Sequence, residues 1–391
     1  MTTYRLRDYQ SQASDAAVRF FSDTSRRNNA IMVLPTGSGK SLVIADIAAR
    51  LEGHTLVFQP SKEILEQNYR KLCSYGVMDC SIYSASMNRK EVSRITFATI
   101  GSVKAHPELF SHFQHIIVDE CHLVNPKEGM YSEFFAAVRC KVLGLTATPY
   151  RLSSSRDFGS MLKFLTRTRP RVFTEVIYHV QVSTLLEMGF LARLQYFALN
   201  PLGWNELDLK VNTTGADYTD KSVQALYDRI DFRAYLVSIV RRLLSPKSGR
   251  PRNGILVFTR FLDEAERLCR QIEGCAIVSG ETPKREREEI LARFKAGELR
   301  VVANVGVLTT GFDYPELDTV VMARPTMSLA MWYQIVGRAI RPHPTKESGW
   351  IVDLCGNLRR FGEVSDLRLE DQGYGKWVVT SRGRQLTNVY F

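Results

Sequence analysis

The chain has 391 residues, of which 45% are hydrophobic and 24% are charged, a composition typical of folded globular proteins. This composition argues against a disordered, collagenous or membrane-spanning protein, and the length favours two domains. Lysine and arginine outnumber aspartate and glutamate by 52 to 41, which gives a formal net charge of +11. An excess of this size suggests a polyanionic partner, most commonly nucleic acid, although a basic protein without such a partner is an open alternative.

The N-terminal residues carry charges where a signal peptide needs an apolar segment, so we expect a cytoplasmic protein. No uncharged apolar run approaches the roughly 18 residues that a membrane span needs. The seven cysteines are scattered along the chain, and none of them forms a Cys-x-x-Cys pair. We therefore expect reduced thiols, with neither a disulfide nor a structural zinc site.

Short apolar runs separated by helical stretches predict an α/β protein with buried parallel strands. In the first part of the chain the runs are 30–34, 55–58, 115–118 and 142–145, with a helix over 41–50. In the second part they are 254–258, 276–278, 299–303, 319–323 and 350–354, with a helix over 264–272. We expect one lobe at 1–165, an irregular connector at 166–225, and a second lobe with a short C-terminal tail at 226–391. Basic residues concentrate at 151–171 and 246–252, where we expect nucleic acid to bind.

A glycine-rich segment follows the first apolar run and opens the first predicted helix. Its residues are Pro35, Thr36, Gly37, Ser38, Gly39, Lys40 and Ser41. Glycines allow backbone N–H groups to surround phosphate oxygens at a helix N-terminus, while the lysine reaches the β- and γ-phosphates and the serine hydroxyl binds Mg²⁺. The strict P-loop pattern has a glycine where this chain has Leu34, so a plain glycine turn is the alternative interpretation.

Two adjacent carboxylates end the apolar run at 115–118, where parallel-sheet proteins place their ligands. In this position Asp119 would hold Mg²⁺ together with Ser41, and Glu120 would orient and deprotonate the attacking water. Near the N-terminus, Arg7 and Gln10 precede the glycine-rich segment, and the amide of Gln10 can read an adenine edge. The two acids, placed about eighty residues after the lysine, favour a nucleotide-hydrolysing site.

Two arginines late in the chain are candidates for binding the γ-phosphate. Arg338 and Arg341 are three residues apart, so we expect them on one face of a helix, close to Gln334. Arginine fingers of this kind contribute about 10³- to 10⁵-fold to the rate, or roughly 4–7 kcal/mol. Two exposed helix arginines with no catalytic role are the alternative.

In their order and spacing these segments resemble the motifs of superfamily 2 helicases, which have two RecA-like lobes with ATP and Mg²⁺ between them. The matching segments are 34–41 (motif I), 59–61 (Ia), 99–102 (Ib), 119–122 (II), 146–149 (III), 257–260 (IV), 308–313 (V) and 334–341 (VI). The Asp-Glu-Cys-His box and the segments 307–313 and 334–338 are most similar to bacterial RadD-type DNA-repair helicases. The cysteine-rich C-terminal region of those proteins has no counterpart before Phe391, so we expect a truncated chain or a shorter phage- or element-encoded relative.

The resemblance implies roles for further residues. For contacts to the phosphates of a nucleic-acid strand it implies Pro60, Ser61, Thr99, Gly101, Ser102, Arg260, Thr282 and Thr309. For coupling of nucleotide state to the strand it implies His122, Thr146 and Thr148, and for the ATP site also Gly311 and Asp313. Small hydroxyl and glycine residues suit such contacts because they bind phosphates without reading bases. Aromatic residues beside the basic ones, Tyr150 and Phe164, are candidates for stacking on bases.

These features predict a DNA helicase or translocase that moves along or remodels DNA in repair or recombination, without strict sequence preference. The partners we expect are single-stranded or branched DNA and a single-strand-binding or repair protein. Non-unwinding translocases on duplex or branched DNA, motor subunits of restriction systems and RNA helicases remain alternatives, and a non-catalytic nucleic-acid-binding module is the remotest one.

Overall fold

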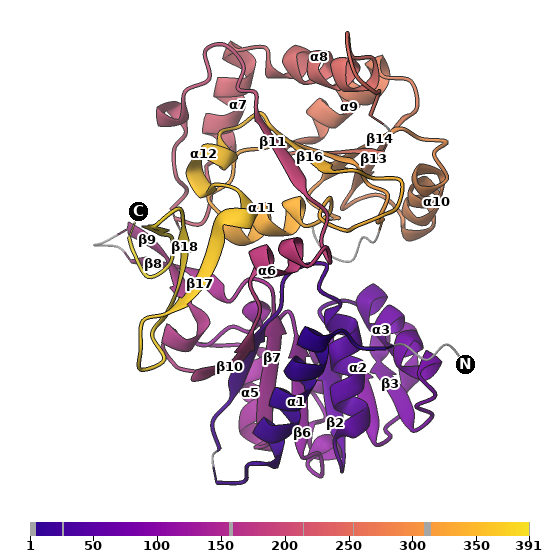
Figure 1. Ribbon diagram of the computed structural model, residues 1–391, viewed down its shortest axis with the longest axis vertical. Helices are drawn as coiled ribbons and strands as arrows, with labels where there is room; N and C mark the ends of the chain where they lie inside the picture. The colour runs from indigo at the N-terminus through magenta and orange to yellow at the C-terminus, as the bar shows by residue number, and fades with distance from the viewer. Residues whose placement is uncertain are drawn as a thin grey trace.

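The computed structural model describes residues 5–25, 27–155, 159–213, 215–252, 254–308 and 314–390, and it contains two α/β lobes that lie one above the other (Figure 1). The first lobe is an eight-stranded sheet in the order β10-β1-β7-β6-β2-β5-β3-β4, parallel except for β4. Its strands are β1 (Ala30–Val33), β2 (Thr55–Phe58), β3 (Cys80–Ser84), β4 (Arg89–Lys90), β5 (Ile95–Ala98), β6 (His115–Asp119), β7 (Lys141–Thr146) and β10 (Glu175–His179). The central strands are buried throughout, which explains their continuous apolar runs.

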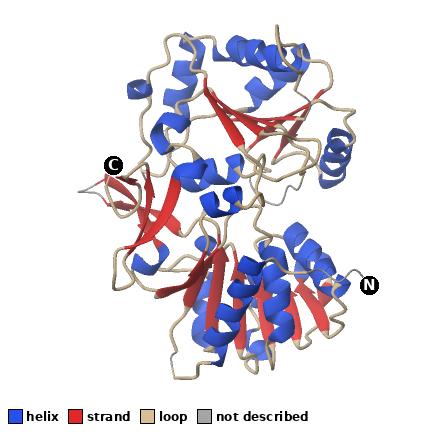
Figure 2. Cartoon of the chain, in the orientation of Figure 1, coloured by secondary structure: helices blue, strands red, loops and turns tan. Residues whose placement is uncertain are grey.

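Helices pack against this sheet, as the secondary-structure view shows (Figure 2). They are α1 (Asp8–Ser22), α2 (Lys40–Arg50), α3 (Lys62–Ser74), α4 (Ile100–Val103) and α5 (Met130–Val138). The α2 helix begins at Lys40, within the glycine-rich segment, and Gly39 adopts a left-handed conformation at its N-cap. The α1 and α2 helices pack against one another, so that α1 covers the start of the glycine-rich segment.

The second lobe is a fully parallel six-stranded sheet in the order β11-β16-β15-β12-β14-β13. Its strands are β11 (Leu194–Ala198), β12 (Ile255–Thr259), β13 (Cys275–Ser279), β14 (Val301–Val305), β15 (Thr319–Ala323) and β16 (Gly349–Asp353). Its helices are α7 (Asp220–Arg229), α8 (Phe232–Leu244), α9 (Leu262–Gln271), α10 (Lys284–Lys295), α11 (Leu329–Val336) and α12 (Asn357–Phe361). The two α/β lobes predicted from the apolar runs are therefore present, with the RecA-like architecture that the resemblance implies.

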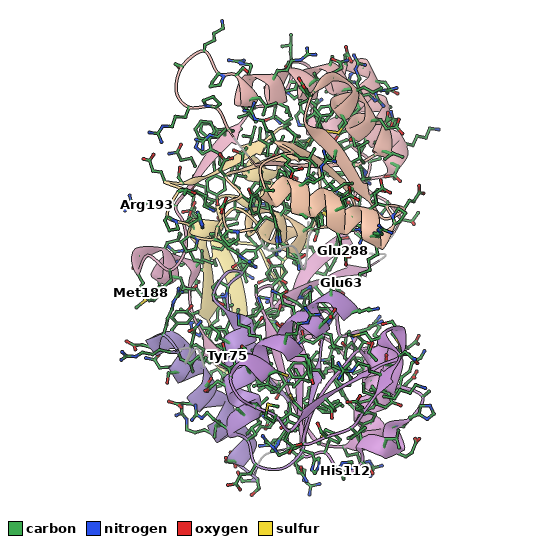
Figure 3. All side chains as sticks on the ribbon, turned by 90° about the vertical axis from the view of Figure 1, so that its right-hand side faces the viewer. Glu63, Tyr75, His112, Met188, Arg193 and Glu288 are labelled. Carbon is green, nitrogen blue, oxygen red and sulfur yellow. A yellow bond between two sulfur atoms is a disulfide. The ribbon has the colours of Figure 1, made fainter. Side chains whose placement is uncertain are left out.

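The segment 166–225, predicted as a connector, contributes one strand to each of the two sheets. β10 pairs in parallel with β1 of the first lobe, and β11 pairs in parallel with β16 of the second. Between these two strands, α6 (Val182–Glu187) and the turn after it pass from the first lobe to the second, and Figure 3 shows Met188 near the level where the lobes meet and Arg193 beside the second lobe. The sequence pattern missed both strands because they lie at sheet edges and are only half-buried, so they lack the continuous apolar runs of central strands.

The C-terminal segment also differs from the predicted short tail. β17 (Leu367–Asp371), β18 (Trp377–Ser381) and β19 (Arg384–Gln385) form an antiparallel sheet. It lies against the first lobe, close to the hairpin of β8 (Tyr150–Ser155) and β9 (Gly159–Phe164), where the yellow and purple ribbons meet in Figure 1. The chain thus returns from the second lobe and packs on the first.

The prediction that the cysteines form no disulfide is wrong. Cys269 and Cys275 are joined by a disulfide, because the turn from α9 into β13 brings their Cα atoms to 4.9 Å. The other five cysteines are free thiols. Among the described residues no helix has the length and apolar character that a membrane crossing requires.

Candidate functional site

A cleft of about 320 Å³ opens between the two lobes, a size within the range of small-molecule sites. It brings together eight of the predicted residues: Arg7, Thr36, Gly37, Gly39, Lys40, Ser41, Asp119 and Glu120 from the first lobe. Gln334, Arg338 and Arg341 line it from the second lobe. Segments more than two hundred residues apart in sequence therefore converge on one polar cleft.

The glycine-rich segment is shaped by two glycines in the left-handed region. Gly37 and Gly39 have φ values of +83° and +81°, which side chains other than glycine rarely adopt. A Cβ atom on Gly39 would lie 2.5 Å from Nε2 of Gln10, so this turn also requires glycine for space. The result is a tight turn at the N-terminus of α2, the geometry that suits phosphate binding.

Gln10 has a different environment from the one expected for an adenine-reading residue. Its Nε2 donates a hydrogen bond of 2.8 Å to the carbonyl oxygen of Ser38, and its Oε1 accepts one of 2.9 Å from the backbone N–H of Arg7. The hydroxyl of Tyr9 donates a second bond of 2.6 Å to the same Ser38 oxygen. Gln10 is buried and lies outside the residues that line the cleft, so here it fixes the glycine-rich turn. Pro35 and Ser38 likewise do not line the cleft.

Lys40, Asp119 and Glu120 form the charged centre of the cleft. The Nζ atom of Lys40 lies 3.4 Å from Oε1 of Glu120. Burial raises the pKa of Asp119, and the neighbouring charge of Glu120 raises it further. Burial also acts to raise the pKa of Glu120, but Lys40 and His122 outweigh it and lower that pKa. The pKa values of the two adjacent carboxylates are therefore shifted in opposite directions. Glu120 is ionised, whereas a nearby cation would stabilise the ionised form of Asp119.

These residues fit a nucleotide with a divalent cation. The hydroxyl of Ser41 and the carboxylate of Asp119 line the same cleft, and oxygen ligands of this kind are those that Mg²⁺ prefers. A buried carboxylate beside a second one has unfavourable electrostatics that a divalent cation would relieve. Among the described residues no group of three or more His, Cys, Asp or Glu side chains is placed to hold a metal ion by itself, so a cation here would also need ligands from its substrate, as is usual for Mg²⁺.

A hydrogen-bond network around His122 links the cleft of the first lobe to the second lobe. Nδ1 of His122 lies 2.9 Å from Oγ1 of Thr146, 3.1 Å from Oγ1 of Thr148 and 3.3 Å from Oε2 of Glu120. On the other side of the ring, Nε2 of His122 lies 3.4 Å from Nε2 of Gln334. This pattern fits the tautomer that carries its proton on Nδ1 and accepts from the Gln334 amide. Of the predicted coupling residues, His122 and Thr146 thus contact Glu120 directly, and Thr148 contacts His122.

The two candidate arginine fingers lie in the cleft, but not on a helix face. α11 ends at Val336, and Arg338 and Arg341 follow in turns beyond its C-cap, Gly337. At this helix end Gly337 packs closely against Thr36 of the first lobe, where a Cβ atom would lie 2.7 Å from the Thr36 Cγ2. Burial lowers the pKa of Arg338 to about 10, which leaves its guanidinium charged at neutral pH. Burial lowers the pKa of Arg341 as well.

Most predicted strand-binding residues lie at turns after strands, several of them engaged in local hydrogen bonds. Oγ of Ser61 caps α3 by accepting a bond of 3.3 Å from the N–H of Ile64. The hydroxyls of Thr99 and Ser102 lie 2.9 Å apart, and Gly101 beside them is exposed with open space around it. Pro60 is half-buried beside Ser61, and Oγ1 of Thr282 accepts a bond of 2.9 Å from the N–H of Ser279.

Three side chains that were predicted to contact nucleic acid are instead packed within the protein. The side chain of Arg260 is only 9% exposed and forms ion pairs with Asp217 at 3.2 Å and Asp220 at 2.8 Å, because α7 packs over the end of β12. Tyr150 and Phe164 are buried in the core of the β8–β9 hairpin and cannot stack on a base. Thr309, Gly311 and Asp313 lie outside the described residues.

Several cleft residues had no match among the sequence motifs. Phe190 lines the cleft, and the guanidinium of Arg7 lies 4.1 Å from the centre of its ring. Gln67, Asn68 and Lys71 also line it from one face of α3. Together with Ile64 these residues have the spacing of a single helix face. From the sequence, that spacing could have predicted that they face the same surroundings, but not that these surroundings are the cleft.

Comparisons with known proteins agree with this geometry. Residues 3–151 match the family model described as "Type III restriction enzyme, res subunit", and residues 235–343 match "Helicase conserved C-terminal domain". Each lobe thus matches one of the two models, and the fold is that of two RecA-like helicase lobes. The helicase architecture also occurs in the solved "ATP-dependent Type ISP restriction-modification enzyme LlaBIII bound to DNA", with a TM-score of 0.67, 20% identity, and coverage of 90% of this chain and 28% of that one.

The curated relatives are distant and mostly longer than this helicase chain. A "51.5 kDa protein" of a Lactococcus phage is 25% identical and is covered over 66% of its length, for 84% of this chain. The "Putative ATP-dependent helicase IRC3" of Saccharomyces cerevisiae is 24% identical, with 90% of this chain and 51% of that protein covered. The "DNA 3'-5' translocase XPB2" of Sulfurisphaera tokodaii is 26% identical, with 86% of this chain and 78% of that protein covered. The chain therefore spans about half to two thirds of the first two relatives.

Proposed function

We propose that the protein is a nucleic-acid-stimulated ATPase that uses ATP hydrolysis to move along or remodel DNA. The observation that carries this proposal is the convergence of Lys40 and Glu120 of one lobe with Arg338 of the other on a single cleft. A site divided between two lobes changes shape when the lobes move, so hydrolysis there can be coupled to motion. The printed names of the yeast and archaeal relatives, an ATP-dependent helicase and a DNA translocase, support the same class.

In this proposal the first lobe binds ATP through the glycine-rich turn and Lys40, while Ser41 and Asp119 would hold Mg²⁺. A bound Mg²⁺ would neutralise charge on the phosphates. Glu120 orients the attacking water and accepts its proton. Lys40 lowers the basicity of Glu120 in the structure, so a shift of Lys40 onto phosphate oxygens would make Glu120 a stronger base when substrate is present.

The second lobe supplies charge to the reaction. Arg338 is buried and charged. Its Nε donates a hydrogen bond of 3.2 Å to the backbone oxygen of Gln334. Movement of this segment toward the γ-phosphate would stabilise the transition state and close the lobes. Closure of the lobes would move Gln334, and the hydrogen bond from Gln334 to His122 would pass this movement on to Glu120 and to the motif III threonines.

Within the superfamily, we assign the chain to DNA repair or recombination, on the resemblance of its Asp-Glu-Cys-His box and motif VI to RadD-type helicases. A non-unwinding duplex translocase is the second candidate, because the archaeal relative is named a translocase. One experiment separates these possibilities: the ATPase rate measured against single-stranded DNA, duplex, forks, four-way junctions and RNA. Stimulation by single strands and forks supports the helicase, stimulation by duplex alone supports the translocase, and no stimulation by any of them contradicts the proposal.

A further inference from the structure

The hairpin β8–β9 and the C-terminal sheet are joined at the flank of the first lobe, where β8, β9, β17 and β18 lie close together (Figure 1). The N–H of Asn388 donates a bond of 2.6 Å to the carbonyl oxygen of Leu162, and the N–H of Phe164 donates one of 3.0 Å to Oδ1 of Asn388. The Thr166 hydroxyl donates a bond of 3.4 Å to the carbonyl oxygen of Gly375. Two segments about two hundred residues apart thus form one surface.

This surface contains a hollow of about 430 Å³ whose charged lining is entirely basic. Its cationic side chains are Lys163, Arg167, Arg169, Arg171 and Lys376, and all except the half-buried Lys163 are exposed. We call these five residues the basic hollow. No carboxylate among the described residues forms an ion pair with any of the five, whereas Arg229, Arg233 and Arg382 elsewhere on the surface each have an acidic partner. Gathered like charges destabilise a fold unless an anion binds them.

The basic hollow adjoins a second hollow. This second hollow, of about 410 Å³, shares Lys163 and Arg169 with the first and adds Lys127. Lys127 belongs to the loop that follows the Asp-Glu-Cys-His box, and Arg151 fixes this loop by donating a hydrogen bond to the carbonyl oxygen of Val124. A row of cations across two hollows suits an extended polyanion with several phosphates better than a single phosphate ion.

An aromatic side chain stands at the edge of the basic hollow. Tyr374 lines it at the turn between β17 and β18, and its side chain is fully exposed. It lies between Gly373 and Gly375, all three with positive φ values, a conformation that holds the tyrosine away from the body of the protein. An exposed ring beside unpaired cations is the arrangement that binds single strands, since bases stack on the ring while phosphates contact the cations.

The other basic segment found in the sequence does not share these properties. In the loop at 246–252, Arg252 stacks on Trp350, with its guanidinium 3.5 Å from the ring centre, and pairs with Asp318 at 3.8 Å. The hollow beside this loop is also lined by Glu347. Its charge is therefore partly neutralised within the protein.

We propose that the basic hollow and Tyr374 bind a single nucleic-acid strand, as a contact separate from the motif residues at the ends of the sheet strands. This inference rests on the proposed function for its choice of polyanion. It places a strand against the loop that follows Glu120 and His122, and it gives the C-terminal sheet a role in strand binding.

The test measures binding in the absence of ATP, by fluorescence anisotropy of labelled oligothymidylate and oligouridylate at several salt concentrations. In one variant Arg167, Arg169 and Arg171 are all changed to Gln, and in its control Arg19, Arg242 and Arg270, exposed arginines that do not line the hollow, are changed to Gln. For the first variant we expect the slope of log affinity against log salt to fall by about 2, at roughly 0.7 per lost phosphate contact on a single strand. The control should keep the slope of the unmodified protein.

Tyr374→Ala should weaken single-strand binding by about five-fold to a hundred-fold, while Tyr374→Phe keeps the affinity because the ring remains. Unchanged melting temperatures for these surface variants would show that folding is intact. An unaltered salt slope in the triple variant, an equal loss in its control, or equal losses in Tyr374→Ala and Tyr374→Phe would overturn the inference. Normal strand binding through the hollow with no strand-stimulated ATPase would instead keep this inference and contradict the proposed function.

Discussion

Nε2 of His122 in the first lobe lies 3.4 Å from Nε2 of Gln334 in the second, directly across the interlobe cleft. On its opposite edge the same imidazole contacts Glu120 and two threonines of motif III. The ring can transmit a change in the position of Gln334 to Glu120, because one ring nitrogen faces the second lobe and the other faces the Glu120 carboxylate. Opening the lobes would break this link.

His122→Ala and Gln334→Ala should both lower strand-stimulated ATP turnover while ATP affinity stays close to that of the unmodified protein. Because the two side chains act through one hydrogen bond, the double variant should lose no more than either single variant, with a coupling free energy of about 0.5–3 kcal/mol. The measurement is a double-mutant cycle on kcat. Additive losses would show that the two residues act independently.

Arg338→Ala should lower kcat by about 10³- to 10⁵-fold with little change in ATP affinity, because the guanidinium acts on charge that develops in the transition state. Arg338→Lys keeps the charge but loses the planar donor geometry, so it should recover only part of the rate. Steady-state kinetics together with equilibrium binding of a fluorescent ATP analogue separate the two effects. Equal losses in affinity and turnover would assign Arg338 to ground-state binding instead.

Gly337→Ala should impair closure of the lobes. The new methyl group would lie 2.7 Å from Cγ2 of Thr36 and 3.1 Å from the carbonyl oxygen of Tyr333, so the segment that carries Arg338 must shift. A displacement near 1 Å in such a site costs about 10- to 100-fold in kcat. Gly280→Ala is the matched control, since nothing lies within 4 Å of its added Cβ. Equal kinetics for both variants would contradict the tight contact.

Glu264 gives a pH-dependent prediction for stability. Burial raises its pKa to about 8, and its Oε2 accepts backbone bonds of 3.1 and 3.3 Å from Arg260 and Phe261. The folded state therefore keeps a proton that the unfolded chain releases near pH 4.5, so stability falls as pH rises from about 4.5 to 8. Glu264→Gln removes this titration and should be more stable relative to the unmodified protein at pH 8.5 than at pH 5, by on the order of 3 kcal/mol. Urea unfolding at both pH values measures the difference, and a constant difference would contradict the raised pKa.

The parts of the fold that could be predicted from the sequence are those that depend on local sequence patterns. Strands such as 55–58 and 319–323 are buried on both faces and read as continuous apolar runs, and the glycine-rich turn is local by nature. The half-buried edge strands β10 and β11 carry no such run. The packing of the C-terminal sheet on the first lobe depends on long-range contacts, such as that of Asn388 with Leu162, which no local pattern encodes.

The same distinction applies to the site. Lys40, Asp119 and Glu120 could be placed because a strand, a turn and a helix position them locally. The role of Gln10 depends on the Ser38 carbonyl oxygen, and the role of Arg260 on Asp217 and Asp220, partners that only the folded chain brings near. Tyr150 and Phe164 alternate with basic residues in sequence, but strand alternation sends them into the core.

In the mechanism we propose, water activated by Glu120 hydrolyses ATP in the interlobe cleft under the control of a nucleic-acid strand. The most direct test is the ATPase rate of the unmodified protein and of Glu120→Gln, with and without single-stranded DNA, alongside binding of ATP and DNA. We expect DNA to stimulate the unmodified protein, and the variant to retain both ligands while its turnover falls by about 10²- to 10⁴-fold. Turnover in Glu120→Gln that matches the unmodified protein would contradict the account.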